Sequence, residues 1–258
     1  MIHTREECQR ISRVDRTGDT HMKIVISSEG RTFVWRQGDL HCQYGMVREK
    51  DMQDAKPGAS VTTNTGKVLK VMDADFNELY RRIRRGPQVM PIKDVALAVS
   101  LTGVGKKSKV VDAGAGSGAM ALYLGNICKQ VTTYEVREDF ADICEHNIKL
   151  LGFSNIKLRR QDVYEGIVER NCDAVFLDLA EPWMAIAPAQ KALRAGGFLV
   201  SYSPTVPQIM DFVSALPDGC APRIVECILR DWEVLGRKTR PKSIGIGHSG
   251  FIVATRIP

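Results

Sequence analysis

The sequence predicts an α/β protein whose larger part is built on a mostly parallel sheet. An apolar strand, residues 109–113, runs directly into a glycine-rich turn and then into a helical pattern. After this unit, further strand and helix patterns alternate along the chain. Such alternation produces parallel strands covered by helices, with the ligand crevice at the carboxyl ends of the strands.

The glycine-rich turn contains Gly114, Gly116 and Gly118 in the pattern G-x-G-x-G. Glycine permits positive φ and leaves no Cβ in the way, so that backbone N–H groups at a helix start can approach a ligand closely. The spacing differs from the G-x-G-x-x-G of dinucleotide-binding proteins. We expect a nucleotide-like ligand here; the alternative is a turn that serves only close packing of the helix on the strand.

The next strand, residues 130–134, ends on Glu135. In nucleotide-binding α/β folds an acid at this place, about twenty residues beyond the glycines, accepts hydrogen bonds from both ribose hydroxyls. A later buried strand, residues 172–177, delivers Asp178 to the same edge of the sheet. We therefore expect both acids in one crevice, although an acid at a strand end can also be purely structural.

The remaining elements complete a doubly wound sheet. The pattern predicts helices over 94–102, 139–151 and 188–193, strands over 156–159 and 198–202, and a closing antiparallel hairpin of 223–229 and 248–255 joined by a basic loop, 237–242.

The N-terminal part consists of short strand patterns separated by turns, and predicts a small β domain over residues 1–75. A hairpin is expected between 60–63 and 67–72. Residues 76–258 then form a helical linker and the sheet domain. The linker is predicted as a helix over 76–85 that carries four arginines, which are either a solvated helix face or contacts to an RNA backbone.

Composition narrows the class of protein. The chain has 258 residues, 44% hydrophobic content, a net charge of +6 and a pI near 8.9, a mild bias toward polyanionic partners. No apolar run has membrane-spanning length and no signal peptide precedes the first domain, so we expect a cytoplasmic protein. Seven cysteines without a CxxC pair argue against a disulfide framework and a zinc site.

With these pieces in order, the sequence resembles the tRNA adenine-58 N1-methyltransferases, particularly the single-subunit bacterial and archaeal type. The resemblance covers most of the chain and rests on five segments, 85–88, 112–118, 134–140, 177–183 and 202–208, extended by tail elements such as 248–251. It implies the Rossmann-like fold of methyltransferases that use S-adenosyl-L-methionine (AdoMet), with a seven-stranded, mostly parallel sheet and a C-terminal antiparallel hairpin.

The resemblance also implies roles for particular residues. Asp178 takes the catalytic position, where it orients the adenine N6 amino group and offsets positive charge on the product. The AdoMet-binding residues are Ala113, Gly114, Gly116, Ser117, Gly118, Glu135, Asp162 and Asp178. The tRNA-binding residues are Gln88, Trp183, Tyr202, Arg82 and Arg85, with Trp183 and Tyr202 as the aromatic surfaces for the target base; simple core packing is the alternative for these two.

This sequence departs from the family pattern at two places. Position 180 is alanine where the family usually has proline, and Pro91-Ile92 precede Lys93-Asp94 where many members carry an aromatic residue or histidine followed by proline. The family further implies a homotetramer on tRNA, with Cys220 or Cys227 as candidates for a disulfide between subunits if the source is thermophilic.

Two alternatives stay open. One is another Rossmann-like AdoMet methyltransferase with a small-molecule or protein acceptor, which would leave the N-terminal β domain and the basic stretches unexplained. The other is a noncatalytic tRNA-binding subunit, against which stand the intact glycine turn, Glu135 and Asp178.

Overall fold

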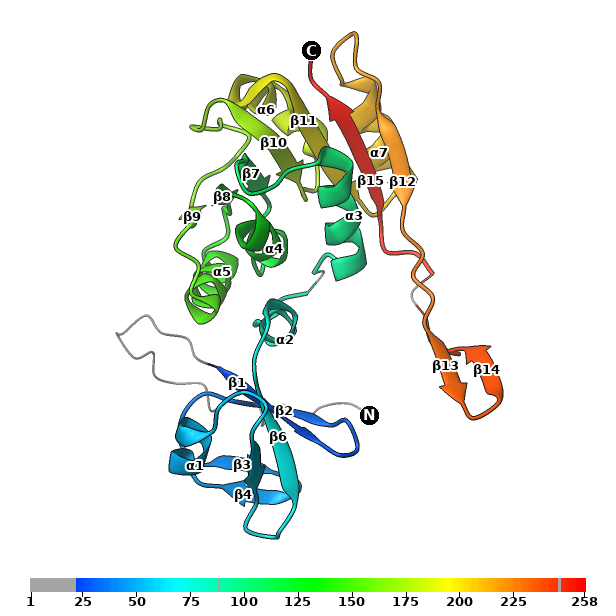
Figure 1. The fold of residues 1–258 in the computed structure, drawn as a ribbon. Coiled ribbons are helices and arrows are strands. Elements are labelled where there is room, and N and C mark those ends of the chain that lie inside the picture. Colours follow the sequence, from blue (N-terminus) through cyan, green and yellow to red (C-terminus); the bar gives the residue numbers. More distant parts are fainter. Residues whose placement is uncertain (1–21, 88, 246) are drawn as a thin grey trace. The chain divides into compact units, whose positions relative to one another are not determined.

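The computed structural model describes residues 22–87, 89–245 and 247–258. The chain divides into two compact units, Met1–Asn77 and Glu78–Pro258. Figure 1 shows the elements of each unit along the chain. Among the described residues, no helix combines the length and the apolar character needed to cross a membrane.

The first unit is a small antiparallel β domain, as predicted. Its four-stranded sheet has the order β2-β1-β6-β5. The predicted hairpin is present, because β5 pairs with β6 around the turn at Gly66. The sequence analysis missed the β3–β4 hairpin and helix α1. The elements are β1 (Lys23–Ser27), β2 (Thr32–Trp35), β3 (Leu40–Cys42), β4 (Gly45–Val47), α1 (Glu49–Asp54), β5 (Ser60–Thr62) and β6 (Val68–Asp73).

The core of this unit forms because inward-facing residues alternate along its strands. Val25, Leu69 and Val71 are fully buried and pack with Trp35 and with Met52 of α1. The amine of Lys23 closes the end of α1 by donating to the carbonyl oxygens of residues 52, 53 and 55 at 2.7, 2.9 and 2.9 Å. These are carbonyls that a helix end leaves without partners.

The second unit contains a seven-stranded sheet in the order β12-β15-β11-β10-β7-β8-β9. Strands β7 to β11 are parallel, whereas β15 is antiparallel to both β11 and β12. The predicted Rossmann-like methyltransferase topology is thus confirmed. The strands are β7 (Lys109–Ala113), β8 (Gln130–Tyr134), β9 (Ile156–Arg159), β10 (Cys172–Leu177), β11 (Leu193–Ser203), β12 (Arg223–Glu226) and β15 (Phe251–Arg256).

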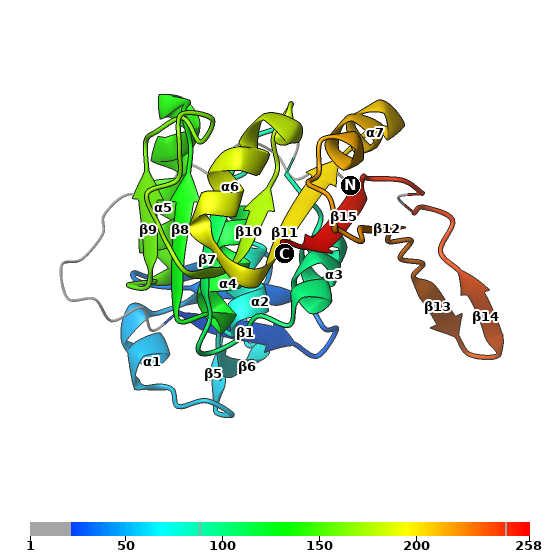
Figure 2. The same cartoon turned by 90° about the horizontal axis from the view of Figure 1, so that it is seen from above.

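Helices cover both faces of this sheet (Figure 1 and Figure 2). Successive residues of a strand point to opposite faces, and Val110 and Val111 of β7 accordingly lie in two different apolar clusters. Helices α3 and α4 pack in the cluster that contains Val110, and α6 and α7 pack in the cluster that contains Val111. The helices are α3 (Ile92–Thr102), α4 (Ala119–Ile127), α5 (Glu138–Leu151), the 3-10 helix η1 (Pro182–Ala185), α6 (Ile186–Ala192) and α7 (Val206–Ser214).

The predicted helix over 76–85 is wrong in its second half. Helix α2 spans only Phe76–Tyr80, and the arginines follow it in an irregular segment. The side chain of Asn147 in α5 accepts from the backbone N–H of Arg84 and donates to its carbonyl oxygen, both at 2.9 Å. These tertiary hydrogen bonds occupy the backbone groups that a longer helix would use.

The predicted basic loop over 237–242 is also wrong. This region forms a two-stranded hairpin of β13 (Trp232–Leu235) and β14 (Lys238–Pro241), which we call the arm. Gly236 supplies the positive φ, +60°, at the tight turn. The expected pairing of the flanking segments is confirmed, although β12 ends at Glu226 and not at residue 229.

Candidate functional site

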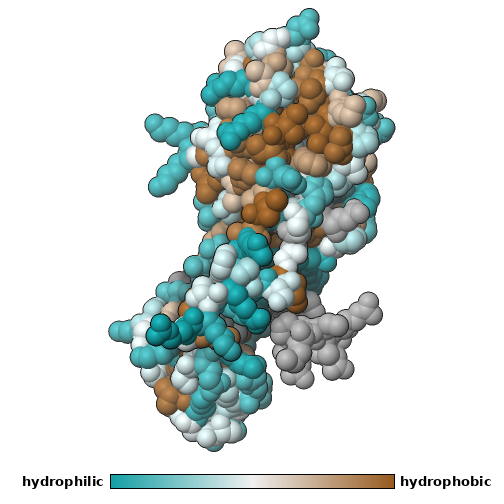
Figure 3. All heavy atoms as spheres, turned by 90° about the vertical axis from the view of Figure 1, so that its right-hand side faces the viewer, coloured by the Kyte–Doolittle hydropathy of each residue, from teal (hydrophilic) through white to brown (hydrophobic). Residues whose placement is uncertain are grey.

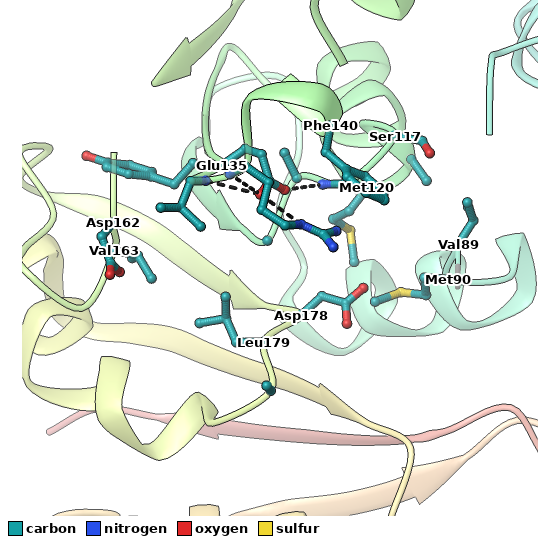
Figure 4. Close-up of a pocket in the computed structure, with 18 of the residues that line it drawn as sticks. Val89, Met90, Ser117, Met120, Glu135, Phe140, Asp162, Val163, Asp178 and Leu179 are labelled. Carbon is teal, nitrogen blue, oxygen red and sulfur yellow. Dashed lines mark hydrogen bonds and ion pairs between the residues drawn. The ribbon is translucent and has the colours of Figure 1, made fainter. Parts of the chain in front are cut away.

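A cavity of about 530 Å³ opens at the carboxyl ends of β7, β8 and β10. The glycine turn after β7 forms one wall, and Glu135 and Asp178 reach the cavity from β8 and β10, the strands on either side of β7 (Figure 4). The sequence-predicted residues that line it are Gly114, Gly116, Ser117, Glu135, Asp162 and Asp178.

The glycine turn follows β7 in an unusual backbone conformation. Gly114, Gly116 and Gly118 have φ values of +85°, +51° and +81°. A Cβ on Gly114 would lie 2.0 Å from the carbonyl oxygen of Asp178, and one on Gly118 would lie 3.0 Å from Cys144 Sγ. In contrast, a Cβ on Gly116 would meet nothing closer than 3.9 Å. The outer two glycines are therefore needed for packing, and Gly116 leaves open space at the cavity.

Glu135 is nearly buried, and its carboxylate fixes the glycine turn. One oxygen accepts from Gly116 N–H at 2.8 Å, and the other accepts from the N–H groups of Val136 and Arg137 at 3.1 and 3.0 Å (Figure 4). An ionised carboxylate can accept about four hydrogen bonds. Three are supplied by the backbone, so that the Gly116-bonded oxygen keeps capacity for a hydroxyl group from a ligand.

Asp162 lies on the segment after β9, and Glu135 lies between it and Ser117 of the glycine turn (Figure 4). One of its oxygens accepts from Tyr164 N–H at 2.8 Å, and no described residue donates to the other. Tyr134 anchors the far end of the same segment: its hydroxyl donates to Glu169 and accepts from Val168 N–H at 3.0 Å. The segment is thus held at both ends while it lines the cavity.

Asp178 follows β10 and its backbone N–H donates to the carbonyl oxygen of Ala113 at 2.9 Å. Its carboxyl group lies among apolar neighbours, near Leu179 and Met90 (Figure 4). Burial, assisted by the negative charge of Asp112, raises the pKa of Asp178 to about 7. The site therefore contains an acid that a positive charge would convert to its ionised form at neutral pH.

Asp112 is a second buried acid below the turn. Burial raises its pKa to about 7, against the hydrogen bond that Thr133 Oγ1 donates to it at 2.6 Å. The residue does not line the cavity. Its effect on the site is electrostatic, because it disfavours charge on Asp178.

Other predicted site residues lie away from the cavity lining. Ala113 and Gly118 are the first and last residues of the glycine turn. Trp183 is partly buried and packs against the apolar cluster beneath α6 and α7. Tyr202 is buried and its hydroxyl donates to Ser249 O at 2.7 Å. Arg82 and Arg85 are exposed in the segment after α2. Gln88 lies outside the described residues.

The cavity contains several residues that the sequence analysis did not single out. The segment before α3 contributes Val89 and Met90, and the segment after β11 contributes Pro204 and Gln208. Gln208 donates to the carbonyl oxygen of Ala180 at 2.9 Å. The position of Pro204 just beyond a parallel strand was a usable signal. Nothing in the local pattern around Met90 indicates that it reaches the cavity.

The donor and acceptor set of the cavity fits AdoMet. Amide groups at a helix start, a carboxylate with capacity for a hydroxyl, and a second acid beyond it match a nucleoside carrying an amino-acid tail. No cluster of three metal-binding side chains occurs within the described ranges.

Comparisons with known proteins agree with this geometry. Residues 79–250 match the family described as the tRNA methyltransferase complex GCD14 subunit. The chain is 30% identical to the tRNA (adenine(58)-N(1))-methyltransferase TrmI of a Thermus thermophilus strain, over 94% of each chain. It is 26% identical to the tRNA (adenine(57)-N(1)/adenine(58)-N(1))-methyltransferase TrmI of Methanocaldococcus jannaschii, over 92% of this chain and 95% of that one.

The fold has close counterparts among solved structures. A SAM-dependent O-methyltransferase from Thermotoga maritima superimposes with a TM-score of 0.81, at 23% identity and over 92% of each chain. At this level of identity the likeness concerns the fold alone.

Proposed function

Because the chain belongs to the family described as the tRNA methyltransferase complex GCD14 subunit, we propose that it methylates N1 of adenine 58 in the T-loop of tRNA. The observation that carries this proposal is Asp178, a partly buried acid that no cation among the described residues pairs with, in the same cavity as the glycine turn and Glu135. The family match favours tRNA over the small-molecule and protein acceptors, and the intact cavity favours an enzyme over a noncatalytic subunit.

AdoMet is the cofactor, and it supplies a methyl group on a positively charged sulfur. The turn Ala113–Gly118 offers backbone N–H groups to its amino-acid end. Glu135 accepts from the ribose hydroxyls, and Asp162 accepts from the adenine amino group. The apolar contacts come from side chains such as Val163 and Phe140, which line the same cavity.

Asp178 acts on the target base. Adenine N1 carries a lone pair and needs no strong base before it attacks a methyl group. The product is cationic, so a carboxylate beside N6 holds the base in line and stabilises the positive charge that develops on it. Met90, Leu179 and Pro204 line this part of the cavity, and apolar surroundings strengthen the electrostatic interaction.

The tRNA backbone requires cationic contacts. Arg81, Arg82, Arg84 and Arg85 are exposed, and they follow one another closely between α2 and the cavity-lining segment at Val89. We assign them to phosphate groups near the target base. Gln88 and Trp183 stay proposals for base contacts, whereas Tyr202 is buried with its hydroxyl donating to Ser249 O and is assigned a supporting role.

A homotetramer is also part of this proposal. Figure 3, which looks at the side of the structure that carries β12 to β14, shows hydrophobic side chains gathered on the upper part of this face, in the second unit. Exposed apolar residues of the arm and its approach are Ile228, Leu229, Trp232, Val234 and Leu235. Such a surface suits burial against another subunit. A sedimentation profile with only monomer at micromolar concentration would contradict the tetramer, and the disulfide proposed at Cys220 or Cys227 with it.

The tRNA substrate also supports our expectation that the protein acts in the cytoplasm. The direct test of the reaction is mass spectrometry of nucleosides after unmodified tRNA is incubated with protein and AdoMet. Absence of 1-methyladenosine at position 58 would refute the proposed function. Mass spectrometry of ribonuclease fragments of the same tRNA locates 1-methyladenosine at position 58 and reports whether adenine 57 is methylated as well.

We predict that Glu135→Gln weakens AdoMet binding by about 10- to 100-fold, since hydrogen bonds to a charged group contribute about 1.5–3 kcal/mol. The amide keeps the shape of the side chain but has one acceptor oxygen, whereas the native carboxylate accepts from three backbone N–H groups. Isothermal titration calorimetry measures the affinity. Glu138→Gln is the matched control, because this nearby acid is exposed and pairs with Arg160. Equal AdoMet affinity in wild type and Glu135→Gln would remove Glu135 from the site.

For Asp178 we expect a loss in the chemical step. Asp178→Ala should bind AdoMet and tRNA within a few-fold of wild type but methylate on the order of 10²–10³ more slowly in single-turnover assays. Asp178→Asn should lie between the two. Glu181→Gln, an exposed acid three residues further, should behave as wild type. Near-normal rates for Asp178→Ala would disprove the assignment.

The raised pKa of Asp178 adds a pH test. The acid is protonated below about pH 7 and ionised above it, so kcat/KM of the wild type should increase as the pH rises through about 7. Under saturating AdoMet the rise should shift to lower pH, because a nearby positive charge favours the carboxylate. Asp178→Asn should lack this dependence, and a rise of the same size in that variant would assign the titration to another group.

The arginines predict a salt effect. Each lost phosphate contact should reduce the slope of log affinity against log salt concentration by about one unit. The double variant Arg82→Ala/Arg85→Ala should therefore reduce the slope by about two units in tRNA-binding titrations. Lys106→Ala/Lys107→Ala removes two exposed cations at the opposite end of the strands and serves as the control. If both double variants keep the wild-type slope, the arginines are solvent-exposed side chains that do not contact tRNA phosphates.

A further inference from the structure

The segment that precedes β15, residues 248–250, contacts both walls of the apolar part of the cavity. On one side, Ser249 Oγ donates to Asp94 Oδ2 at 2.6 Å, in the first turn of α3. On the other side, the carbonyl oxygen of Ser249 accepts from Tyr202 OH at 2.7 Å. Asp94 of α3 lies four residues after the cavity residue Met90. Tyr202 of β11 lies two residues before the cavity residue Pro204. One residue thus joins the two walls.

Lys93 completes the first connection. Its amine lies 2.8 Å from Asp94 Oδ1, and the side chains are 7% and 0% exposed. It also donates to Ser249 Oγ at 2.5 Å and to the carbonyl oxygen of Cys227 at 2.6 Å. An ammonium group has three donors, and all three are used here. Lys93 therefore has no donor for a tRNA phosphate, and its charge serves the interior.

The second connection, between residues 248–250 and Tyr202, is tightly packed. A Cβ on Gly250 would lie 2.4–2.6 Å from ring atoms and the hydroxyl of Tyr202, so the backbone rests directly on the aromatic ring. His248 adds a contact to the wall itself: Nε2 lies 3.1 Å from the carbonyl oxygen of Pro204, and Nδ1 lies 2.9 Å from Glu226 Oε2. Both partners are acceptors, so both nitrogens donate, and this arrangement requires the imidazolium form.

We propose that Ser249, with Lys93 and Asp94 on one side and Tyr202 on the other, is a positioning residue that sets the distance between the Met90 and Pro204 walls. This inference rests on the proposed function, because the gap between these walls is where the target base meets Asp178. A misplacement of about 1 Å between reacting groups can cost about 10²-fold in rate. Tyr202 acts on the base through its hydroxyl and Ser249, and not by stacking.

The first experiment compares Ser249→Ala with Ser249→Thr, which keeps the hydroxyl. Ser249→Ala should lower the single-turnover methylation rate about 10- to 100-fold, while the dissociation constants for AdoMet and tRNA stay within about twofold. Ser249→Thr should recover most of the rate. Ser100→Ala, at an exposed serine further along α3, should have no effect. An unchanged rate in Ser249→Ala, or a parallel loss of AdoMet affinity, would overturn the proposal.

Tyr202→Phe separates positioning from stacking and is the second variant if Ser249→Ala does not fold. Phenylalanine keeps the ring and removes only the hydroxyl that donates to Ser249. Positioning predicts a loss of about tenfold in the single-turnover rate; stacking predicts the full rate, which would overturn our assignment.

Hydrogen–deuterium exchange tests the connection independently of catalysis. Ser249→Ala should increase exchange both in the peptide that contains Met90 and in the peptide that contains Pro204, whereas Ser100→Ala should increase neither. If wild type formed no 1-methyladenosine but exchange rose at both walls, the proposed function would fail and the structural link would stand. Exchange unchanged at either wall would overturn the link itself.

Discussion

The structure depends on one close approach, that of the glycine turn after β7 to the end of β10. The carbonyl oxygen of Asp178 occupies the space where a side chain on residue 114 would begin, at 2.0 Å from the ideal Cβ position. The N–H of Asp178 also donates to Ala113 O. Glycine at 114 therefore allows two neighbouring parallel strands to end side by side. Because of this contact, the turn that is proposed to bind the cofactor and the acid that is proposed to act on the base line one cavity.

Glu135 extends the same constraint to the third strand. Its carboxylate binds Gly116 N–H, and its own backbone follows β8 directly. The acid that is proposed to hold the ribose is therefore also a support of the turn. A ligand hydroxyl does not need to displace these bonds, because the carboxylate has acceptor capacity beyond them. Part of the binding site is preorganised by bonds that exist without the ligand, which lowers the ordering cost of binding.

The sequence was informative where one strand end carries one functional residue. Glu135 and Asp178 each follow a strand of apolar residues, and parallel strands bring their carboxyl ends to one edge whatever the loops do. Met90 and Gln208 could not be located in this way, because tertiary packing brings their segments to the cavity. The prediction of a helix over 76–85 failed for the same reason. Asn147 lies sixty-three residues from Arg84 along the chain, and its hydrogen bonds to the backbone of Arg84 determine the local conformation. The arm was missed because its charged strand has polar residues on both faces and lacks the alternation that indicates a half-buried strand.

The buried Lys93–Asp94 pair and the partly buried Asp178 have opposite chemical characters, and the difference follows from their partners. Lys93 and Asp94 satisfy one another and the backbone, so their charges are compensated and their geometry is fixed. In the part of the chain that the structure describes, Asp178 has no such partner, and burial raises its pKa to about 7. An uncompensated acid is costly to ionise until a cation lies beside it. In the proposed reaction, Asp178 therefore contributes least when the base is neutral and most as positive charge moves onto N1, so the interaction would strengthen along the reaction and lower the barrier rather than only tighten substrate binding.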